Sequence, residues 1–444
     1  VATILSIAIS PWLLHIFTDF IPKGISFSSI NQLHVWVFLL LLVVVVSLLA
    51  GVYPALILSR FQPVSVLKNN TNAGGTNSGR VWLRKSLTVT QFVIAQFLVI
   101  ATLVVSKQIH YSLHKDLGYK KEAIVTFNTR WNFFSDKVDN RRFELLEKLK
   151  AIPEINKVCV AGSAPASFST SSTTLKLEDA GRKVESMVEV KSANADFFSI
   201  YGLDIIHGRT LRPSDTALEY VINETYARAL GYAKTEDAVG KMIEKNAVTL
   251  PIVGIVKDFH TKSTHDAIKP LAFSDNKKNS FTMHLSLKPA GNDPETWKRG
   301  LAKIETAYKS LYPEDDFSYA FFDETIASFY ESEKQISRLL NWATGLCIFI
   351  SGLGLLGLVI YSTNQRTKEI GVRKVLGASV MNIISLISAD FIRLVFIAFV
   401  IAAPIAWWAM NRWLENFAYR TSMSWWIFAT CCLGMLIISM FILG

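Results

Sequence analysis

The sequence predicts an α-helical transmembrane protein with about six spans and one large extracytoplasmic domain of α/β, or mixed α+β, architecture. Half of the 444 residues are hydrophobic, and they gather in long uncharged runs rather than in amphipathic segments, which is the composition of a membrane protein. Between two of these runs, residues 120–322 instead alternate short β-rich runs with charged helical ones. That alternation is typical of a soluble α/β domain.

The spans are predicted from the apolar runs themselves. The run 35–59 carries no charge and is longer than the roughly 20 residues that cross a bilayer core. Proline inside such a run is acceptable because neighbouring helices satisfy the freed carbonyl groups. The predicted spans are approximately 2–17, 35–59, 87–106, 339–361, 391–410 and 425–441.

The basic residues of the short connections predict how the spans are oriented. Lysine and arginine hold short connections on the cytoplasmic side, and the connections after Ser59 and after Tyr361 are both rich in them. These residues are Arg60, Lys68, Arg80, Arg84 and Lys85 in the first connection, and Arg366, Lys368, Arg373 and Lys374 in the second. A single crossing then places residues 107–338 outside the cytoplasm.

Two halves of this outer segment each predict a strand, a helix and a strand. The predicted elements are 123–127, 141–151 and 157–160 in the first half, and 280–287, 294–311 and 318–322 in the second. We expect the halves to pair in one sheet, with the strands near 186–191, 219–222 and 250–256 forming an inserted lobe at about 170–275. Both flanking membrane helices connect to the same lobe, so movement of these helices would pass directly to the outer domain.

Composition and motifs exclude several classes of function. The net charge of +10 owes much to the cytoplasmic connections, so it gives no reason to expect nucleic acid. The glycine-rich stretch 74–79 lacks a following Lys and Ser/Thr, and Gly240-Lys241 is followed by Met242, so no P-loop is present. We expect no cofactor, and any ATP hydrolysis must come from another chain. Cys159 is the one cysteine of the outer domain, which excludes a disulfide within it.

Three features have both a functional and a structural interpretation. His260 and His265 in KDFHTKSTHD resemble metal ligands, but their spacing defines no coordination geometry, so we favour a structural role and expect no metal. The hydroxyl-rich run 167–174 has no partnered general base, so we expect no catalytic residue there. Asp390 and Arg393 share one helical face where the bilayer begins, which favours an interfacial ion pair over a proton or ion relay.

The chain begins and ends in equivalent units. Each has a helix with an internal proline (Pro11 or Pro404), a short outer loop, and a Trp-x-Phe entry into another helix. A repeat spaced by nearly the whole chain predicts a duplicated protein. We therefore expect a fragment that lacks an N-terminal part, with its own outer domain, and the extreme C-terminal tail. Between the copies, NNTNAGGTNSG (69–79) predicts a flexible linker.

The segment 363–379, TNQRTKEIGVRKVLGAS, forms a basic connection between two apolar runs. It is either a plain topogenic anchor or a docking element for a soluble partner. Topology accounts for its four basic residues, but not for its glycines or Glu369. This favours docking.

Several motifs, in order, resemble the FtsX/MacB-like permeases of ABC transporters, in the double-length form found in Bacteroidetes. The resemblance covers essentially the whole chain. The cytoplasmic and last outer connections match in KEIGVRKVLGAS (368–379) and WLENFAYRTSMSWWIF (413–428). The outer domain matches the family's periplasmic core domain in NADFFSIYGLDIIHGR (194–209), VINETYARALGY (221–232) and PIVGIVKDFHTKSTHDAIKP (251–270).

The resemblance implies a division of the chain. Residues 1–68 would hold the last two helices of a first permease unit, and 69–85 a cytoplasmic linker. Residues 86–106 and 339–362 would be the helices that flank a MacB-like core domain at 107–338. A cytoplasmic coupling segment at 363–379 and the last two helices at 380–444 would complete an FtsX-like permease domain.

The resemblance also implies partners and a location. A separate ABC ATPase dimer would bind the cytoplasmic segments of this non-catalytic subunit in the bacterial inner membrane. The implied contact residues are Lys368, Glu369, Gly371, Arg373, Lys374 and Gly377. Further implied partners are membrane lipid, a periplasmic adaptor or outer-membrane protein, and a second permease unit in a homodimer or pseudodimer. Nothing in the outer domain selects a substrate, so efflux and mechanotransmission are both compatible.

Two rival classes are weaker. A membrane receptor with an extracytoplasmic ligand-binding domain would place a signalling module after the second flanking helix, where this chain has two further spans. A membrane-tethered enzyme would need a clustered catalytic set, which the sequence does not offer.

Overall fold

The computed structural model describes residues 2–16, 32–59, 77–130, 139–179, 181–289, 291, 293 and 295–443. The chain divides into two compact units, residues 1–90 and 91–444. Each unit is described by itself.

The first unit is helical. It holds α1 (Ala2–Ile16), α2 (Leu33–Ser59) and the beginning of α4 (Asn77–His114). The predicted linker 69–79 is wrong at its end, because Asn77, Ser78 and Gly79 already belong to α4. Asparagine and serine are tolerated at a helix start, and the strongly helical run that follows extends the helix back over them. The earlier part of the linker lies outside the described residues.

Four helices of the described chain are long and apolar enough to cross a membrane. They are the part of α4 from Trp82 to His114, α10 (Glu331–Gln365), α12 (Val380–Leu414) and α13 (Trp425–Leu443). Two shorter apolar helices, Thr3–His15 and Leu33–Leu48, fall where the first two of the six predicted spans lie. At about 1.5 Å per residue, α10 is longer than a bilayer core of about 30 Å. It therefore extends beyond the bilayer core.

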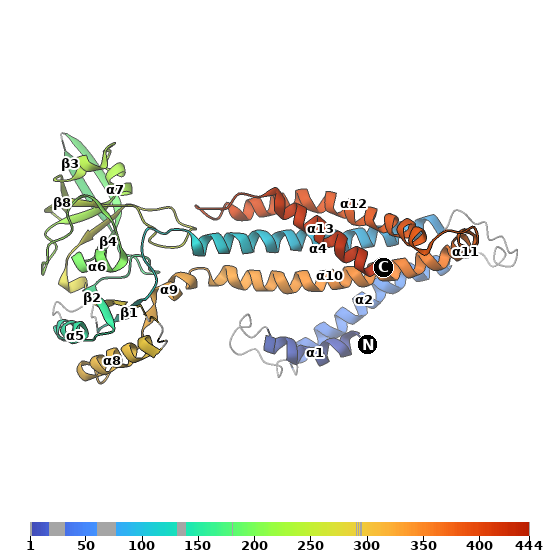
Figure 1. The fold of residues 1–444 in the computed structure, drawn as a ribbon, viewed down its shortest axis with the longest axis horizontal. Helices are drawn as coiled ribbons and strands as arrows, with labels where there is room; N and C mark the ends of the chain where they lie inside the picture. Colours follow the sequence, from blue (N-terminus) through green and yellow to red (C-terminus); the bar gives the residue numbers. More distant parts are fainter. Residues whose placement is uncertain are drawn as a thin grey trace. The chain divides into compact units, whose positions relative to one another are not determined.

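The outer domain begins with a four-stranded sheet of order β11-β1-β10-β2. The strands are β1 (Ile124–Asn128), β2 (Ile155–Ala161), β10 (Thr282–Leu287) and β11 (Ala320–Phe321). The predicted halves thus pair in one sheet, and β10 inserts between β1 and β2 with antiparallel register on both sides. Helices α5 (Arg141–Lys150) and α8 (Glu295–Leu311) pack on it through Leu145, Leu149 and Ile304. We name this sheet and its helices the first lobe (Figure 1).

The second lobe is a seven-stranded sheet of order β5-β8-β6-β9-β4-β3-β7. Its strands are β3 (Ser172–Asp179), β4 (Arg182–Ser192), β5 (Ile205–Gly208), β6 (Tyr220–Asn223), β7 (Met242–Lys245), β8 (Val248–Val256) and β9 (Leu271–Ser274). The helices between them are α6 (Ala195–Tyr201), α7 (Glu224–Ala229) and the 3₁₀ turn η3 (Thr235–Ala238), and the 3₁₀ turn η4 (Lys277–Asn279) follows β9. The lobe is inserted between β2 and β10 of the first sheet, so the chain crosses between the lobes twice.

A series of buried hydrogen bonds joins the two lobes. The Tyr201 hydroxyl lies 2.7 Å from Nδ1 of His284 on β10, and Nε2 of His284 lies 2.8 Å from the carbonyl oxygen of Gly162. Gly162 donates its backbone N–H to Ser192 on β4 at 2.8 Å. A Cβ atom on Gly162 would lie 3.1 Å from the Ser192 nitrogen, so glycine permits this close approach. These buried hydrogen bonds fasten the two lobes to each other.

The second unit also has a helical part. It is formed by α4, α10, α12 and α13, which run alongside one another (Figure 1). Polar side chains tie α4 to two of its neighbours. Gln96 Nε2 donates to the carbonyl of Val395 on α12 at 3.1 Å, and the Thr102 and Thr344 hydroxyls lie 3.0 Å apart between α4 and α10. Such hydrogen bonds fix helix register where surrounding lipid offers no polar partner. Helix α9 (Phe322–Ser328) connects the first lobe to α10.

Candidate functional site

The predicted coupling segment 363–379 is not an irregular loop. Helix α10 ends at Gln365, and α11 (Thr367–Val375) begins two residues later. Gly377 has φ +88°, and its N–H bonds to the Lys374 carbonyl while the N–H of Ala378 bonds to Arg373. These two bonds form a Schellman end, which needs the left-handed conformation that glycine adopts easily. The motifs in the sequence locate the segment but do not indicate its helix, because the run is short and bounded by turns.

The charged residues of the segment pair along α11 itself. Arg373 donates to Glu369 one turn away at 2.7 Å, and both side chains remain about half exposed. Such an i, i+4 pair stabilises a helix only slightly, so both groups stay available to a partner. Lys374 lies in the last turn of α11, where its positive charge interacts favourably with the negative end of the helix dipole. The position of a Cβ on Gly371 has nothing within 4 Å, so this face of α11 is open.

An exposed apolar surface follows these charges. We name it the apolar tip, and it consists of Val372, Val375, Leu376, Val380 and Met381, with exposed fractions between 60% and 88%. These residues surround the turn between α11 and α12. Sequence reasoning missed them because apolar residues next to a membrane span look like its continuation. The sequence feature that could have identified them is their position on both sides of Gly377, where the chain turns.

An ion-pair cluster holds the segment against the next helix. The predicted pair of Asp390 and Arg393 on α12 is present at 3.8 Å. Asp390 also accepts from Arg366 at 3.2 Å, and Arg366 is the residue between α10 and α11. The sequence did not indicate this third member. Asp390 therefore fixes the start of α11 relative to α12.

The second candidate site is where the outer domain meets the membrane helices. We name it the junction, and it comprises the loop 260–265, the outer ends of α4 and α10, and the connection 415–424 between α12 and α13. Thr264 lies at its centre. Its Oγ1 is 2.8 Å from the Ser112 hydroxyl on α4, and its N–H donates to the Tyr330 hydroxyl at 2.9 Å. Its carbonyl accepts from the N–H of Tyr419 at 3.0 Å.

Further bonds join α4 to the same connection. Gln108 donates to the Tyr419 carbonyl at 3.1 Å and accepts from the N–H of Thr421 at 2.8 Å. Lys107 donates to the Ser422 carbonyl and to the Ser424 hydroxyl, at 2.9 and 2.8 Å. One loop of the outer domain thus contacts elements from three separate helical segments, so that a shift of any of them changes contacts in this loop.

His265 pairs with the start of α10. Its Nε2 lies 3.0 Å from a Glu333 carboxylate oxygen, its Nδ1 lies 3.2 Å from the Asn416 carbonyl, and its ring stacks on Phe417. Both ring nitrogens face acceptors, which favours the doubly protonated imidazolium. The hydrogen bond to Glu333 raises the pKa of His265, with Asp266 adding in the same direction. The structural role favoured for this histidine agrees with these contacts.

His260 lies on the other side of the same loop. Its ring packs edge-on against Tyr419, and the Lys115 ammonium lies 3.5 Å from the centre of the Tyr419 ring. Burial lowers the pKa of His260 to about 4, so this ring is neutral at physiological pH. Among the described residues no group of three or more His, Cys, Asp or Glu side chains is arranged to hold a metal ion.

The His265 pair predicts a stability that depends on pH. Because the folded-state pKa of His265 is raised, the pair stabilises fully below the unfolded pKa of about 6.5 and loses its contribution as pH rises through the folded value. We expect His265→Gln to lower the free energy of unfolding by about 1 kcal/mol at pH 6, and by less at pH 9. Thermal unfolding of the full chain in detergent measures this difference. A pH-independent difference, or a Glu333→Gln variant that keeps the wild-type pH profile, would contradict it.

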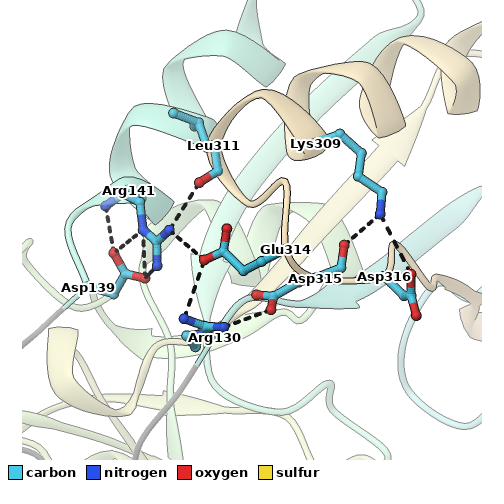
Figure 2. A network of polar contacts seen from close by, with 8 residues as sticks. All are labelled: Arg130, Asp139, Arg141, Lys309, Leu311, Glu314, Asp315 and Asp316. Atoms are coloured by element: carbon cyan, nitrogen blue, oxygen red, sulfur yellow. Dashed lines mark hydrogen bonds and ion pairs between the residues drawn. The ribbon is translucent and has the colours of Figure 1, made fainter.

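A polar network in the first lobe is structural rather than functional. Arg130 and Arg141 bond to acidic residues of the turn after α8, among them Glu314 and Asp315 (Figure 2). Arg141 also donates to the Leu311 carbonyl at 3.1 Å, at the end of α8. These side chains are partly exposed and pair with one another, so the network fastens α5 to the end of α8.

Two protein-family models match separate parts of the chain. The family model of the MacB-like periplasmic core domain matches residues 86–299, and that of the FtsX-like permease C-terminal domain matches residues 341–444. The first match includes both lobes up to the start of α8, and the second includes the coupling segment, α12 and α13.

Curated relatives and solved structures are also similar to parts of the chain. The macrolide export ATP-binding/permease protein MacB of Hahella chejuensis is 22% identical over 206 residues, which cover 44% of this chain and 31% of that protein. The uncharacterized ABC transporter permease YknZ of Bacillus subtilis is 21% identical over 217 residues, covering 47% and 53%. The chain therefore spans between about a third and about half of these relatives. The periplasmic region of MacB from Actinobacillus actinomycetemcomitans has 17% identity and a TM-score of 0.34, covering 49% of this chain and 97% of that one.

Proposed function

Because the chain is an FtsX/MacB-like permease of the ABC transporter class, we propose that it couples ATP hydrolysis by a separate ATPase to movement of its outer domain. In this proposal the chain is a non-catalytic subunit, and the ATPase binds at the coupling segment. The movement serves export or mechanotransmission. The names of the MacB relatives refer to macrolide export, and the substrate of this chain is a separate question.

The observation that carries the proposal is the apolar tip beside a basic helix. Exposed apolar side chains that cluster beside charged ones favour a protein interface. Val375 and Leu376 are 88% and 80% exposed, and Arg373 and Lys374 precede them on α11. A topogenic anchor needs only the basic residues. The apolar tip therefore favours docking, with Lys368, Glu369, Gly371 and Gly377 shaping the same surface.

The junction supports the second half of the proposal, the transfer of movement. Helix α10 runs without interruption from Glu331, beside the outer domain, to Gln365, beside α11. A displacement at α11 is carried along this helix because a helix is stiff along its axis. At the outer end Glu333 bonds to His265 and Tyr330 bonds to Thr264, so the displacement changes contacts of the loop 260–265.

The membrane topology in this proposal is the one that the sequence predicts. Six spans place the coupling segment in the cytoplasm and the two lobes in the periplasm, with the bacterial inner membrane as the location. The two shorter helices of the first unit are the first two spans, and the chain divides at the domain boundaries predicted above. A second permease unit, membrane lipid, and a periplasmic adaptor or outer-membrane protein complete the assembly.

Charge reversal in α11 tests the proposal. Glu369→Lys replaces the bond to Arg373 with repulsion and alters the charge presented to the ATPase. We expect at least about tenfold weaker binding of the copurifying ATPase, since a charged interface contact contributes about 1.5 kcal/mol or more. Binding is measured by copurification with the full chain from membranes, together with ATP hydrolysis in the preparation. The control is Glu178→Lys, which reverses an exposed acid of the second lobe that pairs with Lys183. Unchanged binding by a folded Glu369→Lys chain would refute the assignment.

A further inference from the structure

A cavity of about 670 Å³ lies between the two lobes of the outer domain. Thr126 on β1 and Thr282 on β10 line it from the first lobe, and Val190 and Lys191 on β4 line it from the second. Cavities of about 300–1,000 Å³ are typical of small-molecule sites. We name this space the interlobe cavity. Its described lining residues belong neither to the coupling segment nor to the junction.

Hydroxyl groups dominate one wall of the cavity. Thr173 on β3 and three serines of the segment before it, Ser167, Ser169 and Ser171, all line it. They belong to the hydroxyl-rich run 167–174, in which the sequence predicts no catalytic residue. The described lining includes no carboxylate, imidazole or thiol that would act as a general base. The hydroxyls therefore serve as hydrogen-bonding groups.

A buried ammonium group lines the same cavity. Lys191 is 4% exposed, and its Nζ donates to the Ala164 carbonyl at 2.9 Å and to the Ser163 hydroxyl at 3.3 Å. An ammonium has three donors, so these two bonds leave one. Within the described part of the chain Lys191 forms no ion pair within 4 Å, although Glu189 on the same strand lies close enough to raise its pKa.

A positive charge without a bonded counter-ion is costly in a buried place. Burial lowers the pKa of Lys191 to about 8, with Glu189 opposing this shift and Lys262 adding to it, so the group remains mainly charged at pH 7. Lys245 is the second cation of the lining, and no acidic residue accompanies it among the described lining residues. Glu189 offsets part of the Lys191 charge from the same strand, and an anion in the cavity would accept a hydrogen bond from the remaining donor of the ammonium.

We propose that the interlobe cavity binds a small organic acid, whose oxyanion contacts Lys191 and whose other polar groups bond to the serine and threonine hydroxyls. The oxyanion is a carboxylate or a phosphate. Phe281 and Phe322 also line the cavity and provide apolar surface for the body of such a ligand. The site is additional to the proposed coupling function and does not rest on it, although the Ser167 N–H donates to the Thr261 carbonyl in the junction loop 260–265 at 3.1 Å.

Calorimetric titration of the full chain in detergent tests the site with three probes. Digalacturonate carries carboxylates, sucrose 6-phosphate carries a phosphate, and sucrose is neutral. We expect saturable binding of at least one acid, with sucrose at least about tenfold weaker, since a hydrogen-bonded charge contributes that much or more. The preferred acid identifies the oxyanion. Equal affinity for sucrose and both acids, or no saturable binding of either acid, would overturn the proposal, and this comparison needs no variant.

Substitution of Lys191 provides a second test of the site. Lys191→Met is expected to weaken binding of the preferred acid by about tenfold or more. The matched control is Lys183→Met, which removes an exposed lysine from the same strand and should leave the affinity unchanged. Ser169→Val provides a second cavity variant if Lys191→Met does not fold. Wild-type acid affinity in a folded Lys191→Met chain, or in Ser169→Val where that variant replaces it, would also refute the site.

Discussion

Leu376→Glu is expected to release the ATPase from the permease without unfolding the chain. Leu376 is 80% exposed, so the substitution removes little packing within the chain. In the proposed complex the same position is covered, and a carboxylate buried there without a partner is strongly unfavourable. We expect ATPase affinity to fall about 30-fold or more, because a central interface residue contributes about 2 kcal/mol or more.

The measurement is ATPase binding to the full chain in detergent, followed by ATP hydrolysis of the mixture. Met187→Glu is the matched control, since Met187 is 76% exposed but lies on β4 in the second lobe. It introduces the same charge on an equally open apolar position. Wild-type ATPase binding by Leu376→Glu would place the contact elsewhere, and the apolar tip would then face lipid or a second permease unit.

The parts of the fold that the sequence predicted are those with a local cause. A segment in lipid must satisfy its backbone groups internally, so a long uncharged run such as 35–59 indicates a helix by itself. Strands β1 and β10 and helices α5 and α8 also follow from periodicity within a few residues. Even their pairing in one sheet could be predicted, because two similar halves of strand, helix and strand have few ways to combine.

The junction could not be predicted because its contacts join distant parts of the chain. Thr264 bonds to Ser112, 152 residues earlier, and to Tyr330, 66 residues later. No local pattern marks such partners. His265 was recognised as structural, but its partner Glu333 lies on α10 and has no sequence relation to it.

The interlobe cavity also could not be predicted from the sequence, because its lining residues come from distant parts of the chain. The hydroxyl-rich run 167–174 is evident in the sequence, but the sequence alone does not indicate a binding role for it. Its significance depends on Lys191, which the fold of β3 against β4 brings to the same cavity. A lysine in a strand is ordinarily exposed, so its burial is visible only in the structure.

A reversible cross-link between α4 and α10 is expected to stop the outer domain from responding to ATP. The hydroxyl oxygens of Ser106 on α4 and Ser337 on α10 lie 3.5 Å apart, close enough for a disulfide between cysteines at these positions. The helices enter and leave the outer domain, so relative movement between them is the most direct way to displace the first lobe. In Ser106→Cys/Ser337→Cys, oxidation fixes the two helices together at this level.

Hydrogen–deuterium exchange of the assembled permease and ATPase, with and without ATP, measures the response. We expect ATP to change exchange in the loop 260–265 and in β10 of the wild type and of the reduced double variant, and to change neither after oxidation. The single variants Ser106→Cys and Ser337→Cys are the controls. An oxidised double variant that responds like the wild type would mean that α4 and α10 move as one body. Movement would then reach the outer domain through the connection 415–424, whose bonds to Gln108 and Thr264 provide the other route.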